Sequence, residues 1–362
     1  MAQNNLFNRK NKSQLIQEQL KESFKRKTCS FYRYVKITNP PSLRDSLYKE
    51  WLGLKVLGRV YLAKEGINAQ ISIPEPNWND LIEKLDSHPE FSKMFIKTAV
   101  MEADQSFLKL IVRVKNKIVA DGINDETFDS SDVGTYLTAA EFNTAMKEPN
   151  AIVVDMRNYY ESEVGHFENA ICPDVETFKK SLPIVKEQLA DKKEHKILLY
   201  CTGGIRCEKA SAYLKHNNFK DVNQLKGGII EYSHQIKKNK LDSKFIGKNF
   251  VFDSRMGEEI SGDTISHCHQ CDKSSNHHTN CQNQACHILF IQCKDCEEKY
   301  NGCCSVECSE IADLDIEKQK ILRKDPVKAA PLKQYQKGVK PRLKDLIRER
   351  EKALTNRLKK QF

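Results

Sequence analysis

The strongest chemical signal in the sequence is a cysteine that directly follows an apolar, β-rich segment. Residues 196–201 read KILLYC, and Cys201 opens a loop that ends at Arg206. Ligands bind beyond the carboxyl ends of parallel strands, and a tight glycine loop there turns its amide N–H groups toward the bound group. With Arg206 and the following helix start, these groups should lower the pKa of the Cys201 thiol and make it a reactive thiolate. The loop residues predicted to shape this site are Thr202, Gly203, Gly204, Ile205 and Arg206.

A buried structural cysteine before a turn is the simpler interpretation of Cys201. It leaves the two glycines and Arg206 unexplained, because structural cysteines lack such an electropositive setting. We therefore favour the reactive thiolate.

A second concentration of chemistry lies between residues 268 and 308, which hold nine of the thirteen cysteines. Two CxxC pairs stand in this region, the spacing typical of structural zinc, and two tetrahedral sites need eight ligands. We predict one or two zinc ions, with ligands from Cys268, Cys271, Cys281, Cys286, Cys293, Cys296, Cys304 and Cys308.

The sequence leaves open which of these cysteines share an ion. Five histidines could also supply ligands: His267, His269, His277, His278 and His287. An iron–sulfur cluster is the alternative metal group. Disulfides are disfavoured because the chain starts without an export signal.

Composition limits the class of protein. A chain of 362 residues is long enough for two or three domains, and 39% hydrophobic with 30% charged residues describes a well-solvated surface. No apolar run approaches about 18 residues, so we expect no transmembrane helix. The first residues lack the apolar region of a secretory signal, so we expect a cytoplasmic protein. A membrane protein, a secreted disulfide scaffold and a wholly disordered chain are thereby excluded.

The net charge of +10 is concentrated at the two ends of the chain. Residues 1–27 carry +5 and residues 309–362 carry +8, so the part between them is slightly acidic. Basic ends suit a polyanion such as RNA, although solvated tails explain the charge equally well. Near the C-terminus an apolar stripe at helical spacing consists of Leu343, Leu346, Ile347, Leu354 and Leu358.

The elements that must position these residues fall into a series of predicted domains. Residues 28–120 alternate β-α-β-β-α-β, the split pattern of a ferredoxin-like domain. Its strands are predicted at 27–37, 55–63, 67–73 and 107–119, and its helices at 41–53 and 77–87. Residues 135–240 predict a parallel α/β layer. Its buried strands are expected at 151–156 and 196–201, and its helices at 137–146, 178–190 and 208–216.

The remaining segments complete the predicted organisation. We expect an irregular stretch from about 236 to 262 and a cysteine-rich zinc region after it. The other predicted segments are a basic polar tail (1–27), linkers (121–134 and 241–265), the zinc region (266–310) and a basic helical tail (311–362).

The segment from about 135 to 240 resembles a rhodanese domain. Residues 154–157 (VDMR), Glu161 and residues 165–167 (GHF) match its first signature, whose usual final Gly-Ala reads Asn169-Ala170 here. The loop from Cys201 to Arg206 matches the active-site loop, and KGG at 226–228 matches a later turn. The resemblance implies that Cys201 accepts sulfur as a persulfide. Four residues separate it from Arg206, the short form that suits sulfur rather than phosphate.

Two neighbouring motifs have a chemical and a simpler interpretation. Cys207 could resolve a persulfide as a disulfide, but packing in the first helical turn is the interpretation that we favour. His166 and Glu168 could belong to an iron site of two histidines and one carboxylate. The rhodanese signature already explains His166, and no partner histidine stands out.

The order of the regions narrows the resemblance. LAKEGINAQ (62–70), YCTGGIRCEKA (200–210), HTNCQNQACHILFIQCKDC (278–296) and GCCSVEC (302–308) together resemble the rhodanese-related tRNA uridine-34 5-hydroxylases over about residues 28–310. The resemblance implies an enzyme that uses O2 to hydroxylate C5 of the wobble uridine, with Cys201 as its catalytic residue.

The resemblance also implies partners. The basic ends and the zinc region would hold the anticodon arm of tRNA, because phosphate contacts position RNA while an unstacked loop base is read in a pocket. A sulfur donor or a reductant protein is the other expected partner, because the sequence identifies no electron donor. It contains neither an evident iron triad nor a dinucleotide fingerprint.

Two alternatives of other functional classes compete with this interpretation. The first is a rhodanese-type sulfurtransferase or sulfur-relay protein that acts on RNA or on a protein partner. The second is a non-catalytic RNA-binding module, which is disfavoured because Cys201, both glycines and Arg206 are all present.

Overall fold

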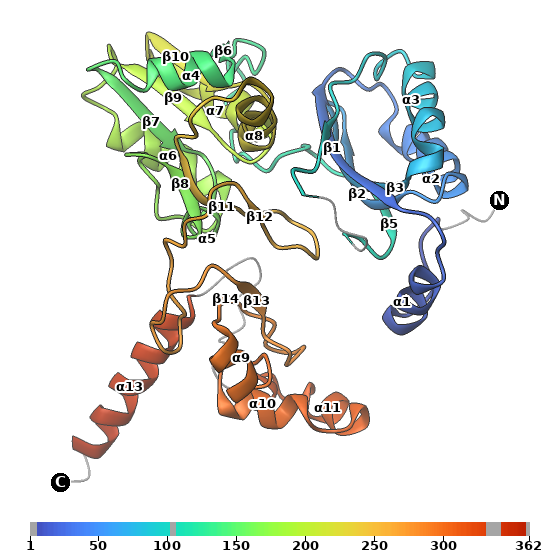
Figure 1. Cartoon of the computed structure of the whole chain (residues 1–362), viewed down its shortest axis with the longest axis vertical. Helices are drawn as coiled ribbons and strands as arrows, with labels where there is room; N and C mark the ends of the chain where they lie inside the picture. The colour runs from blue at the N-terminus through green and yellow to red at the C-terminus, as the bar shows by residue number, and fades with distance from the viewer. Residues whose placement is uncertain (1–5, 102–105, 331–341, 360–362) are drawn as a thin grey trace. The chain divides into compact units, whose positions relative to one another are not determined.

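The structure is a computed structural model that describes residues 6–101, 106–330 and 342–359 (Figure 1). The chain forms two compact units. Unit 1 comprises residues 1–162, 166–245 and 249–260, and unit 2 comprises residues 163–165, 246–248 and 261–362. None of the helices formed by the described residues has the length and apolar character that crossing a membrane requires.

The first part of unit 1 is a five-stranded sheet in the order β4-β1-β3-β2-β5. Helices α2 (Pro40–Gly53) and α3 (Trp78–Ser87) lie on one face of this sheet (Figure 1). The strands are β1 (Arg26–Tyr34), β2 (Leu57–Ala63), β3 (Gly66–Pro74), β4 (Lys97–Thr98) and β5 (Leu110–Val114), preceded by helix α1 (Lys12–Leu20). Trp51 of α2 is fully buried among strand residues, so the apolar face of the sheet is the core. The ferredoxin-like prediction is confirmed.

One strand of this domain lies at an unexpected edge. In the split pattern the last strand lies beside the first, and the prediction gave that role to residues 107–119. The structure instead forms β5 there, parallel to β2 at the opposite edge. The two-residue strand β4 pairs with β1. A strand of two residues has no periodicity to read, so the sequence could not reveal it.

The second part of unit 1 is a four-stranded parallel sheet in the order β6-β10-β9-β7. Its strands are β6 (Thr135–Leu137), β7 (Ala151–Asp155), β9 (Lys196–Tyr200) and β10 (Asp221–Leu225). Its helices are α4 (Ala139–Ala145), α5 (Tyr159–Ser162), α6 (Phe178–Gln188), α7 (Ile205–His216) and α8 (Gly228–Asn239). Helices α6 and α7 share one hydrophobic cluster with the sheet, and α4 and α8 share another, so both faces are covered. Strand β9 is central, which explains its uninterrupted apolar run.

The stretch expected to be irregular, from about 236 to 262, contains two strands. Strands β11 (Phe245–Asn249) and β12 (Glu258–Glu259) join β8 (Gly165–Phe167) in a three-stranded sheet. Every second residue of β11 is buried. Gly247 and Lys248 within this strand weaken its apolar pattern, which is why the sequence did not reveal it.

Unit 2 is built around a short antiparallel hairpin and a core of cysteines. Its elements are β13 (His278–Asn280), β14 (Leu289–Ile291), α9 (Lys294–Lys299), α10 (Val306–Ala312), α11 (Ile316–Leu322), α12 (Pro326–Ala329) and α13 (Leu343–Lys359). Leu343 is buried against the cysteines, and Leu346 and Ile347 pack beside it, as the predicted stripe requires. The side chains of Leu354 and Leu358 lie outside the described part of α13.

Candidate active site and metal centres

Cys201 lies at the carboxyl end of the central strand β9, where the sequence predicts a reactive cysteine. Its side chain is fully buried, and the Gly204 N–H donates to its Sγ at 3.1 Å. Gly204 precedes α7 with φ of +100°, a left-handed backbone that glycine adopts without strain. The loop therefore turns an amide toward the sulfur, as expected of an anion nest.

The surroundings of Cys201 favour its thiolate. Burial alone would raise the pKa, but hydrogen bonds from Cys207 and the charge of Arg206 lower the pKa of Cys201 to about 5. Cys207 is buried in the first turn of α7, and burial together with the neighbouring Cys201 raises its pKa well above the usual value. At neutral pH the sulfur of Cys201 is therefore an anion that accepts a hydrogen bond from a neutral Cys207 thiol.

Arg206 is held by a buried carboxylate of the first rhodanese signature. Its guanidinium donates to both oxygens of Glu161, at 2.6 and 2.9 Å, and to Oγ1 of Thr202 at 3.1 Å. Burial would raise the pKa of Glu161, yet the charge and hydrogen bonds of Arg206 keep it below the usual value. The two side chains form a pair without net charge that fixes the loop.

Other signature residues set the backbone around the site. Asp155 and Arg157 form a buried ion pair at 2.7 Å, and the Tyr200 O–H donates to Asp155 at 2.7 Å. Asn169 has φ of +56°, where glycine is usual and asparagine is tolerated, so the departure from the Gly-Ala pair preserves the turn. Nδ1 of His166 hydrogen-bonds its neighbour's carbonyl, and His166 belongs to no group of three ligands within the described residues.

The KGG turn at residues 226–228 packs against the loop that begins at Cys201. Gly228 has φ of +67°, and a Cβ there would lie 2.4 Å from the carbonyl oxygen of Cys201. The N–H groups of Ile229 and Ile230 donate to the carbonyls of Cys201 and Thr202 at 3.0 and 3.2 Å. The first turn of α8 thus holds the backbone of the Cys201 loop in place through these two hydrogen bonds.

Gly228→Ala should destabilise unit 1, because the added carbon meets a backbone oxygen and the left-handed φ opposes alanine. We expect a loss of about 1–3 kcal/mol in the free energy of unfolding, measured by denaturant titration. Gly53→Ala is the matched control, since nothing lies within 4 Å of a Cβ there. Equal midpoints for the two variants would contradict the close packing of this turn on the loop.

The first domain of unit 1 contributes residues to this site that the sequence did not identify. The Tyr32 O–H donates to Glu208 on α7 at 2.8 Å, and the same oxygen would lie 2.7 Å from a Cβ on Gly204. Lys209 on α7 pairs with Glu65 at 2.8 Å. Glu65 lies within the LAKEGINAQ motif, so this motif could have indicated that the first domain contributes to the site. Tyr32 is far from the loop in sequence, so no local pattern indicates its place.

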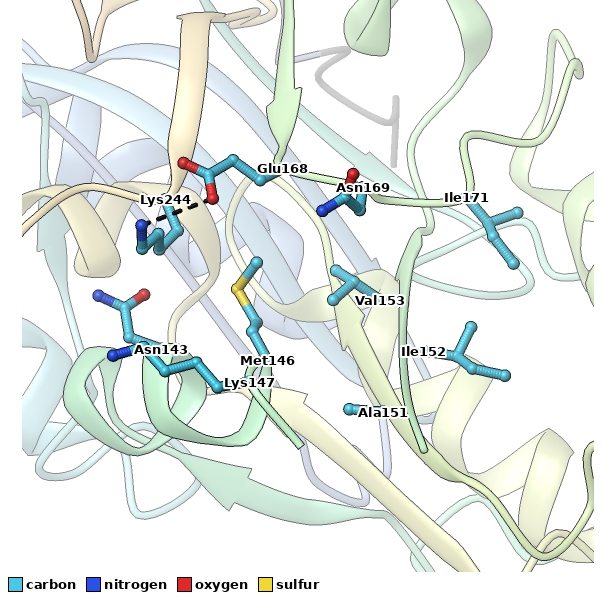
Figure 2. Close-up of a pocket in the computed structure, with 10 residues that line it drawn as sticks. All are labelled: Asn143, Met146, Lys147, Ala151, Ile152, Val153, Glu168, Asn169, Ile171 and Lys244. Atoms are coloured by element: carbon cyan, nitrogen blue, oxygen red, sulfur yellow. Dashed lines mark ion pairs between the residues drawn. The ribbon is translucent and has the colours of Figure 1, made fainter. Parts of the chain in front are cut away.

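A cavity of about 400 Å³ lies elsewhere in the second domain of unit 1, beside the edge strand β7 (Figure 2). Glu168 and Lys244 form an ion pair at its rim, at 3.5 Å. Its other lining residues are Asn143, Met146, Lys147, Ala151, Ile152, Val153, Asn169 and Ile171. Cys201 and the loop residues after it do not line this cavity, so we do not assign the reaction to it.

The eight cysteines predicted as metal ligands gather into two groups of four. Cys268, Cys271, Cys293 and Cys296 form the first tetrad, and Cys281, Cys286, Cys304 and Cys308 form the second. The sulfur atoms within each tetrad lie within 4.8 Å of one another. Each tetrad could therefore hold a metal ion. The sequence left open which cysteines share an ion, and the structure shows that pairs from the two tetrads alternate along the chain.

The hairpin of β13 and β14 explains this interleaving. The first tetrad comes from segments before β13 and after β14, whereas Cys281 and Cys286 of the second lie in the loop between the strands. Tetrahedral thiolate coordination of zinc separates the sulfurs by about 3.8 Å, and Cys286 and Cys304 lie 3.6 Å apart. The donor sets thus fit zinc. Cys303 and the five histidines lie outside both tetrads.

Three protein families match successive parts of the chain. They are described as "UPF0176 acylphosphatase like domain" (residues 26–118), "Rhodanese-like domain" (138–235) and "Rhodanase C-terminal" (246–309). Among solved structures, a rhodanese-like domain protein from Staphylococcus aureus covers 27% of this chain and 90% of its own, at 22% identity and a TM-score of 0.23.

Curated relatives match nearly the whole chain. A protein of Leptospira interrogans is 56% identical over 84% of this chain and 83% of its own length, and one of Hamiltonella defensa is 51% identical over 88% and 90%. A Salmonella typhimurium protein is 50% identical over 84% and 87%. All three are named tRNA uridine(34) hydroxylase. With its cysteine loop, its acylphosphatase-like first domain and this identity over most of its length, the chain belongs to the tRNA uridine(34) hydroxylase family.

Proposed function

We propose that this chain hydroxylates C5 of uridine 34 in tRNA, with Cys201 as the reacting residue. The single observation that carries the assignment to Cys201 is its buried sulfur in an intact loop at the carboxyl end of β9, where it accepts the Gly204 N–H. The relatives' shared name supplies the substrate. A tRNA substrate also agrees with the cytoplasmic location expected from the sequence.

The reaction needs more than a nucleophile. We assign the inserted oxygen atom to O2, and reduction of the second oxygen atom to water consumes two electrons and two protons. A reductant protein or a sulfur donor supplies the electrons in this proposal. The Cys201 thiolate is suited to carry sulfur as a persulfide, because at neutral pH its low pKa favours attack on the outer sulfur of a donor persulfide, whose S–S bond breaks and whose own thiolate leaves.

The remaining regions serve the substrate in this proposal. Each cysteine tetrad holds one structural zinc ion, which fixes the short elements of unit 2 that lack a large apolar core. The basic ends and unit 2 contact phosphates of the anticodon arm. In the described part of α13, Arg348, Arg350 and Lys352 are exposed, interspersed with acidic residues.

Nucleoside analysis of tRNA tests the proposal directly. In cells that lack this protein and any redundant pathway, we expect 5-hydroxyuridine and the nucleosides derived from it to disappear from position 34. Re-expression of the chain should restore them. Unchanged levels in the deletion strain would contradict hydroxylation and favour the sulfurtransferase, whose loop length and thiolate are also present. Loss of sulfur-containing nucleosides alone would identify that alternative.

A further inference from the structure

Lys97 is a buried cation beside the Cys201 loop that the proposed reaction has not yet used. It lies on β4 of the first domain and is 2% exposed, and its Nζ has no hydrogen-bond partner within the described residues. Its Cε would lie 3.7 Å from a Cβ on Gly203. The ammonium thus ends against the loop that holds the sulfur.

Among the described residues, two aromatic rings rather than a hydrogen-bond acceptor lie close to the Nζ of Lys97. The Nζ lies 4.9 Å from the ring centre of Tyr32 and 5.2 Å from that of Phe95. Such cation–π contacts stabilise an ammonium only weakly. Burying an ammonium without a compensating anion is strongly unfavourable. An anion close to Lys97 is therefore needed to balance its charge.

Two carboxylates also face Lys97, but neither hydrogen-bonds its Nζ. Glu208 accepts hydrogen bonds from the O–H groups of Tyr32 and Tyr136, each at 2.8 Å, and Glu231 on α8 accepts one from Gln235 at 3.0 Å. Arg206, the other cation of the loop, is paired with Glu161. The other titratable groups that face Lys97 are Tyr32 and the thiols of Cys201 and Cys29, and the pKa of the Cys201 thiol is lowered to about 5.

Resting on the proposed role of Cys201, we propose that Lys97 is a positioning residue whose ammonium is the counter-ion of the sulfur anion, thiolate or persulfide, carried by Cys201. The first domain thereby completes a site whose loop belongs to the second. Burial lowers the pKa of Lys97 to about 8, and the Cys201 anion opposes that shift most strongly. Each charge stabilises the other, so the loss of Lys97 must raise the pKa of Cys201.

The test is a pH titration of thiolate ultraviolet absorbance in the full, metal-loaded chain. The signal of Cys201 is isolated by subtracting the same variant with Cys201→Ser. We expect Lys97→Met to raise the Cys201 pKa by about one unit or more, and Lys97→Arg to restore the parent value. Lys36→Met, which removes an exposed charge from the same domain, should leave the pKa unchanged. A parent-like pKa in folded Lys97→Met would overturn the proposal.

A second measurement needs no substitution and so does not depend on the folding of a variant. Iodoacetate is anionic and iodoacetamide is neutral, and both alkylate thiolates. A cation beside the sulfur should therefore raise the rate of alkylation of Cys201 by iodoacetate, divided by its rate with iodoacetamide, above the same ratio for a small free thiol. A ratio at or below that of the free thiol would overturn the proposal. If both measurements succeed while tRNA stays unmodified, the counter-ion role stands and the proposed function fails.

Discussion

Cys201→Ser should abolish formation of 5-hydroxyuridine, with a loss of about a thousandfold or more. A serine hydroxyl stays protonated in a setting that stabilises a thiolate, and it cannot carry a persulfide. The readout is nucleoside analysis of tRNA from a deletion strain that expresses the variant. Because serine is isosteric with cysteine, the hydrogen bond from Gly204 can persist and the fold should be retained.

Cys172→Ser is the matched control in the same domain. The pKa of Cys172 is raised to about 12, chiefly by burial, so its thiol stays neutral and we expect near-parental activity after its substitution. Alkylation of the parent chain provides an independent readout. The Cys201 rate should fall as the pH drops through about 5, because thiol replaces thiolate below its pKa. Full hydroxylation by Cys201→Ser would remove this cysteine from the reaction.

Cys304→Ser should reduce the zinc content from two ions per chain to about one. It removes one thiolate from the second tetrad, whose sulfurs are otherwise supplied by the hairpin loop and α10. Structural zinc contributes about 10–16 kcal/mol in small cysteine-rich peptides. Loss of this ion should therefore unfold much of unit 2, which elemental analysis and limited proteolysis would both detect.

Cys303→Ser is the adjacent control. Cys303 is equally buried but lies outside both tetrads, so the variant should keep two zinc ions and the parental proteolysis pattern. If Cys303→Ser loses zinc and Cys304→Ser does not, the assignment of ligands to the second tetrad is wrong. If the purified parent holds no zinc, the tetrads serve another purpose.

Local signals made much of the active-site loop predictable. The run that ends in Cys201, its two glycines and Arg206 are contiguous, so one segment indicates both the strand and the loop. The eight metal-ligand candidates were also found from residue type and spacing. Their division into two tetrads was not predictable, because it depends on the β13–β14 hairpin. The hairpin loop brings Cys281 and Cys286 close to Cys304, which precedes α10, and to Cys308 within α10.

The unpredicted features depend on contacts between segments distant in sequence. Lys97 lies in a two-residue strand whose position is fixed only by pairing with β1, so no pattern within its own segment indicates the Cys201 loop. Strand β5 carries the expected apolar residues, but an apolar run does not state which edge of a sheet it joins. The ion pair of Glu161 with Arg206 likewise needs both signatures to be folded together.

The packing of α13 links metal chemistry to the C-terminal segment. Leu343 shares one apolar cluster with all four thiols of the second tetrad, and Arg350 pairs with Glu307 on α10. Filling the tetrad and docking the helix therefore stabilise each other by equal free energies. Loss of a metal ion from the second tetrad would therefore weaken the docking of α13 on α10.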